Sequence, residues 1–361
     1  MGEFDLIERY FKRPARQAAR DSLVHLGIGD DCALLQPRPG TQIAISTDML
    51  VEGRHFFAGV DAQALGHKAL AVNLSDLAAC GARPLAFTLA LALPEANEAW
   101  LAAFSHGLFA LADTHGCELV GGDTTRGLLN ICITVFGEVP LQGAQGGAST
   151  ALLRSGARAG DDVYVSGHLG DARLALEVLR GKLQVPEAVL VQSRARLERP
   201  TPRVALGQAL RGIATSAIDV SDGLLGDLAH VLKTSGVGAT LHTAAVLARL
   251  RANPADLSNP ADLSGRAKVA NAGAGLSPPS SLSPLSQNQL LALVLAGGDD
   301  YELAFTAPAS ARAAVAAAAA SAQTPVTRIG NINAEPGLRL LDANGAAVDN
   351  HFASFDHFTN N

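Results

Sequence analysis

Six short segments, each of which sets an aspartate among glycine, serine, threonine or asparagine, constrain the fold of this chain most strongly. They are GIGDDCALL (27–35), ISTDML (45–50), AVNLSDLAACGARP (71–84), ELVGGDTTRG (118–127), AIDVSDGLLGDLAHV (217–231) and GGDDYELAFT (297–306). Carboxylates that crowd into one cleft repel one another unless cations lie between them. Repeated aspartates on tight turns therefore predict a site for hard metal ions and phosphate.

The length and the composition favour two compact domains. The chain has 361 residues, of which 48% are hydrophobic and 17% are charged. Domains usually contain about 100–200 residues, and this composition suits a large buried interior. We therefore expect two ordered domains.

The charge and the apolar pattern argue against a nucleic-acid partner and against a membrane span. The net charge is -6, and no run of lysine or arginine resembles a nucleic-acid footprint. The apolar run 84–94 is about half the ~20 residues that a membrane helix needs, so it predicts a buried strand.

The four cysteines form no CxxC pair, and the N-terminus has no apolar signal core, which predicts reduced thiols and a cytoplasmic protein.

Residues 41 to about 140 alternate between apolar strand patterns and helix patterns, which is typical of an α/β layer. The predicted strands are 41–47, 85–93, 117–122 and 130–139, and the predicted helices are 62–80 and 95–115. A stretch rich in glycine and small polar residues, 141–150, then indicates a hinge. The predicted domains are residues 1–148 and 149–361.

The second domain begins with a strand, 162–167, that leads through glycines into a helix, a geometry that presents backbone N–H groups to phosphate. Residues 217–236 predict a strand end, a loop and an amphipathic helix that ends at Gly236. Residues 251–288 are rich in Pro, Ser, Asn and Gly and repeat the hexapeptide NPADLS, so we expect a mobile surface insertion there.

The acids that follow strands or open helices are the candidate metal ligands: Asp31, Asp48, Asp76, Asp123, Asp219 and Asp222. A single aspartate at a helix start is more often a structural cap. Six of them together favour a shared crevice at aligned strand ends. Ser46 and Thr47 would add a hydroxyl or a carbonyl oxygen, and Mg²⁺ prefers such oxygen ligands.

Phosphate-binding groups are less distinctive. The chain has no GxxxxGK[ST] loop, and GIGDDC lacks the third glycine of GxGxxG. The remaining candidates are Gly121 and Gly122, the turn 166–172, and Arg154 with Arg158, each as consistent with turn formation as with function.

The other polar groups leave several roles open. His55 is a candidate base, ligand or substrate contact, and equally a satisfied polar residue. Asp299 or Asp300 is expected to face the cleft, with Glu302 supporting the turn. No nucleophile elbow, HExxH motif or cysteine pair occurs, so neither a covalent intermediate nor zinc is indicated.

The six segments, followed in the same order by SFDHF (354–358), resemble the thiamine-monophosphate kinase family. The resemblance covers nearly the whole chain apart from 251–288. That family is similar to aminoimidazole ribonucleotide synthetase, selenophosphate synthetase and a hydrogenase maturation factor. The resemblance implies the two-domain fold of aminoimidazole ribonucleotide synthetase, with an α/β N-terminal domain and an α+β C-terminal domain.

The resemblance also implies an activity and a set of residue roles. The implied reaction is phosphorylation of thiamine monophosphate by ATP to thiamine diphosphate, with several Mg²⁺ ions, no general base, and a homodimer formed through the N-terminal domains. The implied metal ligands are the six aspartates with Ser46 and Thr47. The implied ATP contacts are Gly122, Arg154 and Ser221, and the implied substrate contacts are His55, Asp299 and Phe352.

Two of these positions depart from the family pattern. Relatives usually have glutamate where this chain has Asp299, and some place a tryptophan where it has Phe352. Three other interpretations stay open: a sister enzyme similar to aminoimidazole ribonucleotide synthetase, a metal-dependent phosphohydrolase, and a non-catalytic protein that binds ATP. The products formed from ATP and thiamine monophosphate separate them.

Overall fold

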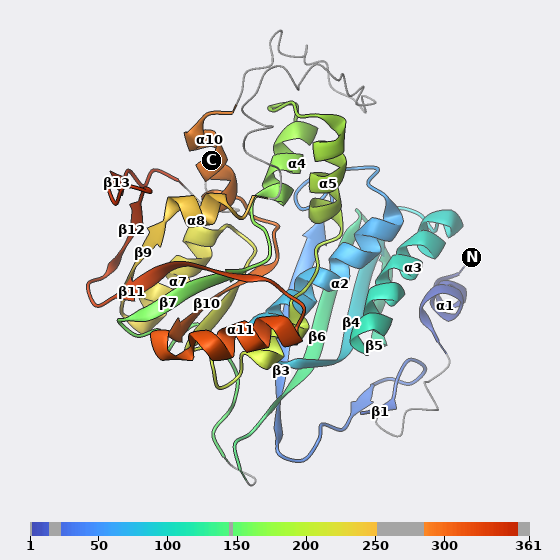
Figure 1. Ribbon diagram of the computed structural model, residues 1–361. Coiled ribbons are helices and arrows are strands. Elements are labelled where there is room, and N and C mark those ends of the chain that lie inside the picture. Colours follow the sequence, from blue (N-terminus) through green and yellow to red (C-terminus); the bar gives the residue numbers. More distant parts are fainter. Residues whose placement is uncertain (1, 14–22, 144–146, 251–284, 353–361) are drawn as a thin grey trace. The chain divides into compact units, whose positions relative to one another are not determined.

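The computed structural model describes residues 2–13, 23–143, 147–250 and 285–352 (Figure 1). The chain forms two compact units: unit 1 contains Met1–Leu152 and Pro202–Gly212, and unit 2 contains Leu153–Thr201 and Ile213–Asn361. Residues 202–212, which we expected in the second domain, therefore pack with unit 1.

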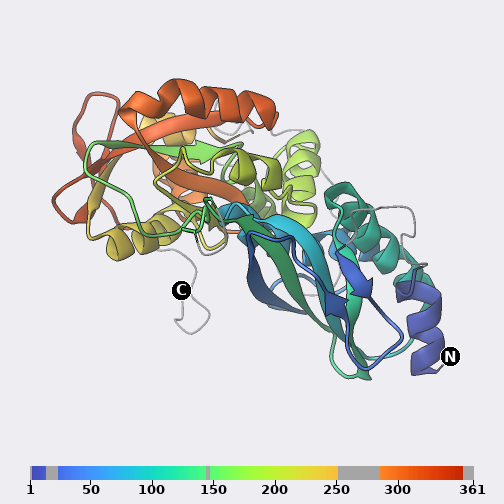
Figure 2. The same cartoon turned by 90° about the horizontal axis from the view of Figure 1, so that it is seen from below.

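Unit 1 is built on a four-stranded sheet with the order β3-β6-β4-β5. Only β4 and β5 are parallel; β6 pairs antiparallel with β3 and with β4. Helices α2 and α3 cover one face of this sheet (Figures 1 and 2). The bounds are β3 Thr41–Val51, β4 Arg83–Leu93, β5 Glu118–Arg126, β6 Asn130–Pro140, α2 Ala62–Ala79 and α3 Glu98–His115.

These elements follow the predicted pattern closely. Helix α3 begins three residues later than predicted because the side chain of Asn97 caps it, accepting a hydrogen bond from the Trp100 N–H at 3.0 Å. Alternate residues of β6, such as Ile131, Ile133 and Val135, are at most 1% exposed under the helices. The core of unit 1 therefore lies between the sheet and its helices.

Glycines set how closely the helices of unit 1 approach one another. A Cβ added at Gly107 of α3 would overlap the carbonyl oxygen of Gln63, and one added at Gly66 of α2 would overlap that of Phe104. Gly207 of α6 (Val204–Ala209) approaches α2 in the same way. Only glycine permits such backbone approach.

Smaller elements complete unit 1. Helical turns α1 (Glu3–Leu6) and η1 (Ile7–Phe11) precede a two-stranded sheet of β1 (Val24–Leu26) and β2 (Leu34–Leu35). Side chains of this hairpin pack on a small cluster formed by Leu85, Ala86 and Val120.

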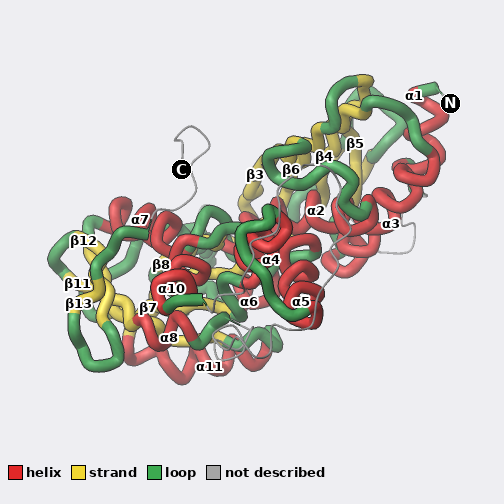
Figure 3. Tube along the Cα trace, turned by 90° about the horizontal axis from the view of Figure 1, so that it is seen from above, coloured by secondary structure: helices red, strands yellow, loops and turns green. Residues whose placement is uncertain are grey.

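Unit 2 contains a seven-stranded sheet with the order β13-β12-β9-β11-β7-β10-β8, in which only the β12–β9 pair is parallel. The helices and strands of this unit are labelled in Figures 1 and 3. The strands are β7 Asp161–Ser166, β8 Ser216–Val220, β9 Gly238–His242, β10 Glu302–Pro308, β11 Val326–Asn333, β12 Gly337–Leu341 and β13 Ala347–Val348. The helices are α4 Asp171–Leu179, α5 Glu187–Glu198, α7 Leu224–Ser235, α8 Thr243–Leu247, α10 Gln287–Ala296, η3 Ala309–Ala311 and α11 Arg312–Ser321.

The core of unit 2 joins the sheet to α7 and α10 through fully buried aliphatic side chains, among them Val220, Leu224 and Val294. Helix α7 ends at Gly236 with a left-handed cap, as predicted. Helix α10 starts with a capping box between Ser286 and Gln289, so regular structure resumes slightly before residue 288. Residues 251–284 of the predicted insertion lie outside the described residues.

Among the helices that the structure describes, none has the length and the apolar character required to cross a membrane.

Substituting Gly107 with alanine tests the close approach of α2 and α3. The new Cβ has no room beside the Gln63 carbonyl, so we expect Gly107→Ala to lower the free energy of unfolding by about 1–3 kcal/mol, although alanine favours helices. Chemical denaturation measures this change. Gly121→Ala is the matched control because nothing lies within 4 Å of its added Cβ. Equal stability of the two variants would contradict the packing.

Candidate active site

Polar residues of β3 and α2 are joined by hydrogen bonds in unit 1. The Ser46 hydroxyl donates a hydrogen bond of 2.5 Å to Oδ2 of Asp76, and the Asp48 N–H donates one of 3.0 Å to Oδ1 of Asn73. Ser46 and Asp48 are two residues apart on one strand, so their side chains share the face that α2 covers. These hard oxygen donors, half-buried beside one another, suit Mg²⁺.

Thr47 and Asp123 lie on the opposite face of the same sheet. The Thr47 hydroxyl pairs with that of Thr134 at 2.9 Å, across the β3–β6 ladder. A row of paired residues runs across the sheet on this open face: Met49, Cys132, Ala90 and Asp123. Any oxygen that Thr47 offers beside Asp48 would therefore be its backbone carbonyl.

The strand order also separates Asp48 from Asp123. Their strands β3 and β5 form the two edges of the sheet, three strand spacings or about 14 Å apart. The expectation that one crevice collects all these acids does not hold within one copy of unit 1. Among the described residues, no group of three or more His, Cys, Asp or Glu side chains is arranged to hold a metal ion.

Asp31 and His55 lie in turns of unit 1. Asp31 is exposed between β1 and β2, and its N–H donates a hydrogen bond of 2.9 Å to Oδ1 of Asp30. Nδ1 of His55 accepts a hydrogen bond of 2.9 Å from the Val51 N–H. The neutral imidazole of His55 therefore carries its proton on Nε2, and Nε2 is the ring nitrogen that can donate a hydrogen bond.

Gly122 precedes Asp123 at a position that requires glycine. Its φ is +149°, and an added Cβ would overlap the carbonyl oxygen of Leu89 on β4. The close approach of β4 and β5 explains this glycine and leaves its backbone exposed beside Asp123.

In unit 2, Asp227 of α7 organises the loop that follows β8. Its Oδ2 accepts hydrogen bonds of 3.1 Å from the N–H groups of Ser221, Asp222 and Gly223. Burial, and then the negative charge of Asp222, raises the pKa of Asp227 to about 7, although these N–H groups oppose the shift. Our sequence reasoning missed this role; the available signal is an acid in the first turn of a helix that follows glycine.

The loop before β10 contains two residues other than glycine with left-handed backbone, Asp299 with φ 67° and Tyr301 with φ 50°. Each costs on the order of 1–2 kcal/mol. Their N–H groups donate hydrogen bonds of 2.8 Å to the carbonyl oxygens of Ser221 and Val220. The Tyr301 hydroxyl donates to Oδ1 of Asp299 at 3.4 Å, so the two side chains lie together.

The neighbouring acids Asp300 and Glu302 are buried, at 1% and 0% exposure. Asp300 accepts a hydrogen bond from the Gly170 N–H at 2.8 Å, and burial raises its pKa well above the ordinary value. Glu302 accepts one from the Ser166 hydroxyl at 2.6 Å. Glu302 therefore supports the turn, as predicted. Of the two candidates Asp299 and Asp300, Asp299 is the partly exposed one.

The remaining predicted residues of unit 2 differ in exposure. Arg154 and Asp222 are exposed, whereas Asp219 lies buried in β8. Phe352 is half-buried against the core of unit 2, and its ring stacks on that of His351 with centroids 4.4 Å apart.

The raised pKa of Asp227 predicts how stability depends on pH. Because the folded state keeps a proton that the unfolded chain releases above about pH 4, this carboxyl makes stability fall as pH rises from about 4 to about 7. We expect metal-free wild type to lose about 2 kcal/mol more than Asp227→Asn between pH 5 and pH 7. Denaturation at both pH values measures the difference, and parallel profiles would contradict the shift.

Comparison with known proteins identifies the family. The family described as "AIR synthase related protein, N-terminal domain" matches residues 29–139. The thiamine-monophosphate kinase of Salmonella typhimurium is 43% identical over 99% of this chain and 98% of its own length. The crystal structure of thiamine-monophosphate kinase from Stenotrophomonas maltophilia has a TM-score of 0.77 and 42% identity, covering 96% of this chain and 98% of its own.

A further solved structure, described as "AaThiL complexed with AMPPCP and TMP", has a TM-score of 0.69 and 27% identity, covering 89% of each chain. These matches confirm the fold that the motifs implied, that of the aminoimidazole ribonucleotide synthetase-related proteins. The chain belongs to the thiamine-monophosphate kinase family.

Proposed function

We propose that this protein transfers the γ-phosphoryl group of ATP to thiamine monophosphate and so forms thiamine diphosphate. The observation that carries the proposal is the Ser46–Asp76 hydrogen bond beside Asp48 on β3, in a chain that matches relatives named for this reaction over 99% of its length. The solved relative described with AMPPCP, an ATP analogue, and TMP supports both substrates.

The residues present fit divalent magnesium. Asp48, Asp76 and Ser46, with the Thr47 carbonyl beside Asp48, would hold ions at the β3 edge of the sheet, and Asp123 would hold one at the β5 edge. Asp31 in unit 1, and Asp219 and Asp222 in unit 2, would supply further carboxylates. When bound, Mg²⁺ would neutralise the negative charge that develops on the phosphoryl group during transfer.

The protein's own groups then bind and align the two anions. The phosphate of thiamine monophosphate is already largely ionised at neutral pH, so no side chain need remove a proton from the attacking oxygen. Arg154 and the backbone of Gly122 and Ser221 would hold ATP. In-line alignment of attacking and leaving oxygens is the main contribution of these contacts.

Three groups would hold the thiamine portion of the substrate. The carboxylate of Asp299 complements a cationic heterocycle, and the ring of Phe352 offers a face on which a cation can lie. Nε2–H of His55 would donate a hydrogen bond. Asp299 is one methylene shorter than the glutamate usual in the family. The distance between its carboxylate and the substrate therefore depends on the conformation in which the loop is held.

An assay of the purified protein with ATP and thiamine monophosphate, in Mg²⁺ or in excess EDTA, tests the proposal. We expect thiamine diphosphate and ADP in equal amounts, formed only with Mg²⁺. Release of inorganic phosphate without thiamine diphosphate would indicate a hydrolase. Binding of ATP without turnover would indicate a sensor, and turnover of ATP only with another acceptor would indicate a sister enzyme.

Neutralising single acids tests the metal assignment. We expect Asp48→Asn and Asp123→Asn each to lower kcat about 100-fold or more, because each removes a fixed charge that acts on the reacting phosphates. Their unfolding midpoints should match the wild type, since both side chains are at least partly exposed. Asp113→Asn, an exposed acid of α3, is the control. A fully active Asp48→Asn/Asp123→Asn protein would contradict the assignment.

We further propose that the protein is a homodimer formed through the open face of the unit 1 sheet. Alternate residues of β3 expose an apolar strip on this face: Ile43 is 38%, Ile45 63% and Met49 51% exposed. Exposed apolar strips of this kind favour a protein interface. The same face carries Thr47 and Asp123, so a second copy that covers the strip would also lie beside these groups.

A charge in the middle of the strip should weaken the dimer. We expect Ile45→Lys to shift the wild-type dimer to monomers, with a dimer Kd raised more than about tenfold, because a buried ammonium is poorly solvated. Light scattering during size-exclusion chromatography measures the mass. Val191→Lys on α5 is a matched control, since Val191 is also 63% exposed. A monomeric wild type, or a dimeric Ile45→Lys, would contradict the interface.

A further inference from the structure

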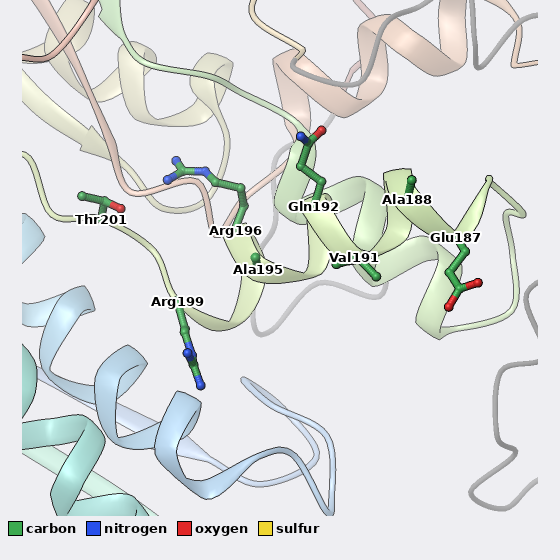
Figure 4. A pocket seen from close by; sticks show the side chains of 8 residues that line it. All are labelled: Glu187, Ala188, Val191, Gln192, Ala195, Arg196, Arg199 and Thr201. Carbon is green, nitrogen blue, oxygen red and sulfur yellow. The ribbon is translucent and has the colours of Figure 1, made fainter.

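Arg196 reaches from the exposed helix α5 into the interior of unit 2. It belongs to a shallow groove formed by Glu187, Ala188, Val191, Gln192, Ala195, Arg196, Arg199 and Thr201. Figure 4 shows its guanidinium extending away from the helix, in a direction different from that of Arg199. The side chain of Arg196 is only 13% exposed, whereas that of Arg194, two residues earlier, is 46% exposed.

The guanidinium of Arg196 contacts Asp300 and Glu302, the residues before and after Tyr301 in the chain. Its Nη2 donates a hydrogen bond of 2.8 Å to Oε1 of Glu302 and one of 3.3 Å to the carbonyl oxygen of Asp300. Glu302 is fully buried and is also held by Ser166 at 2.6 Å. Arg196 therefore links the residues before and after Tyr301 to helix α5.

The loop that Arg196 fastens is the strained one. Asp299 and Tyr301 both have left-handed backbone, and they lie on either side of Asp300. Such conformations persist only where the surroundings enforce them, and they concentrate at ligand-binding sites. The N–H of Asp299 is fixed by the Ser221 carbonyl at 2.8 Å, and Asp300 is fixed by Gly170 and by Arg196.

We propose that Arg196 is a positioning residue that sets where the Asp299 carboxylate meets the cationic thiamine portion of the substrate. The inference rests on the proposed function, in which Asp299 contacts thiamine monophosphate. Arg196 would act through the loop rather than by direct contact with a substrate. It acts by holding the Asp300 carbonyl and Glu302, so that the backbone keeps Asp299 in its strained conformation. Arginine suits this task because its planar guanidinium holds its donors in fixed directions.

The substitution Arg196→Met should change the KM for thiamine monophosphate but not the KM for ATP. We expect the KM for thiamine monophosphate to rise about tenfold, while the KM for ATP changes less than about twofold, because the loop that relaxes carries the thiamine contact. Arg196→Lys, which keeps the charge, should lie between Met and wild type. Arg194→Met is the matched control: it removes an exposed arginine of the same helix that pairs along the helix with Glu198. It should leave both KM values unchanged.

Loss of Arg196 removes a cation that contacts the buried Glu302, so Arg196→Met is also expected to be less stable. The double variant Arg196→Met/Glu302→Gln also removes the buried negative charge and should regain thermal stability. It should keep the raised KM for thiamine monophosphate, because the bond to the Asp300 carbonyl is still missing. A double variant with normal stability and a normal KM would show that Arg196 is structural only.

A double-mutant cycle with Asp299 gives the decisive result. If Arg196 acts through Asp299, then Arg196→Met adds nothing to the KM for thiamine monophosphate in an Asp299→Ala background. If the effects of the two substitutions on this KM are additive, or if Arg196→Met changes the two KM values equally, the inference is overturned. Turnover by the wild type would then leave the proposed function intact. A wild-type protein that makes no thiamine diphosphate would instead overturn the proposed function, and the inference with it.

Discussion

The backbone of residues 220–223 is held along both of its edges, and the functional groups of unit 2 depend on this. The N–H groups of Ser221, Asp222 and Gly223 converge on the Asp227 carboxylate. The carbonyls of Val220 and Ser221 accept the N–H groups of the strained loop before β10. The loop that Asp227 holds therefore supports the loop before β10. One loop carries Asp222 and Ser221, and the other carries Asp299.

Unit 1 achieves its arrangement by strand alternation. Ser46 and Asp48 lie under α2 with Asp76, whereas Thr47 and Asp123 belong to the open face. A sheet buries one face against its helices, so polar groups on the other face remain available to a second surface. The apolar strip that β3 exposes on that face is the observation on which the proposed dimer rests.

Much of this structure was predictable because its signals are local. The periodicity of 62–80 gave α2 almost to the residue, and the glycine at 236 gave the end of α7. The division of acids between two faces was not predictable, because it depends on the strand order β3-β6-β4-β5, which pairs segments far apart in the sequence. Arg196 was missed for the same reason, because its partner Glu302 lies in β10, far away in the sequence. Asp227 was missed although its partners are the N–H groups just before its own helix, because an acid in a first helical turn is usually a structural feature.

The most direct measurement is an anomalous diffraction map of a crystal grown with Mn²⁺ in place of Mg²⁺, a non-hydrolysable ATP analogue and thiamine monophosphate. The carboxylates of Asp48, Asp76 and Asp123 should each lie about 2.0–2.2 Å from an anomalous peak that also contacts phosphate oxygens. Peaks confined to the ATP analogue, with none bonded to these aspartates, would contradict the role assigned to the acids.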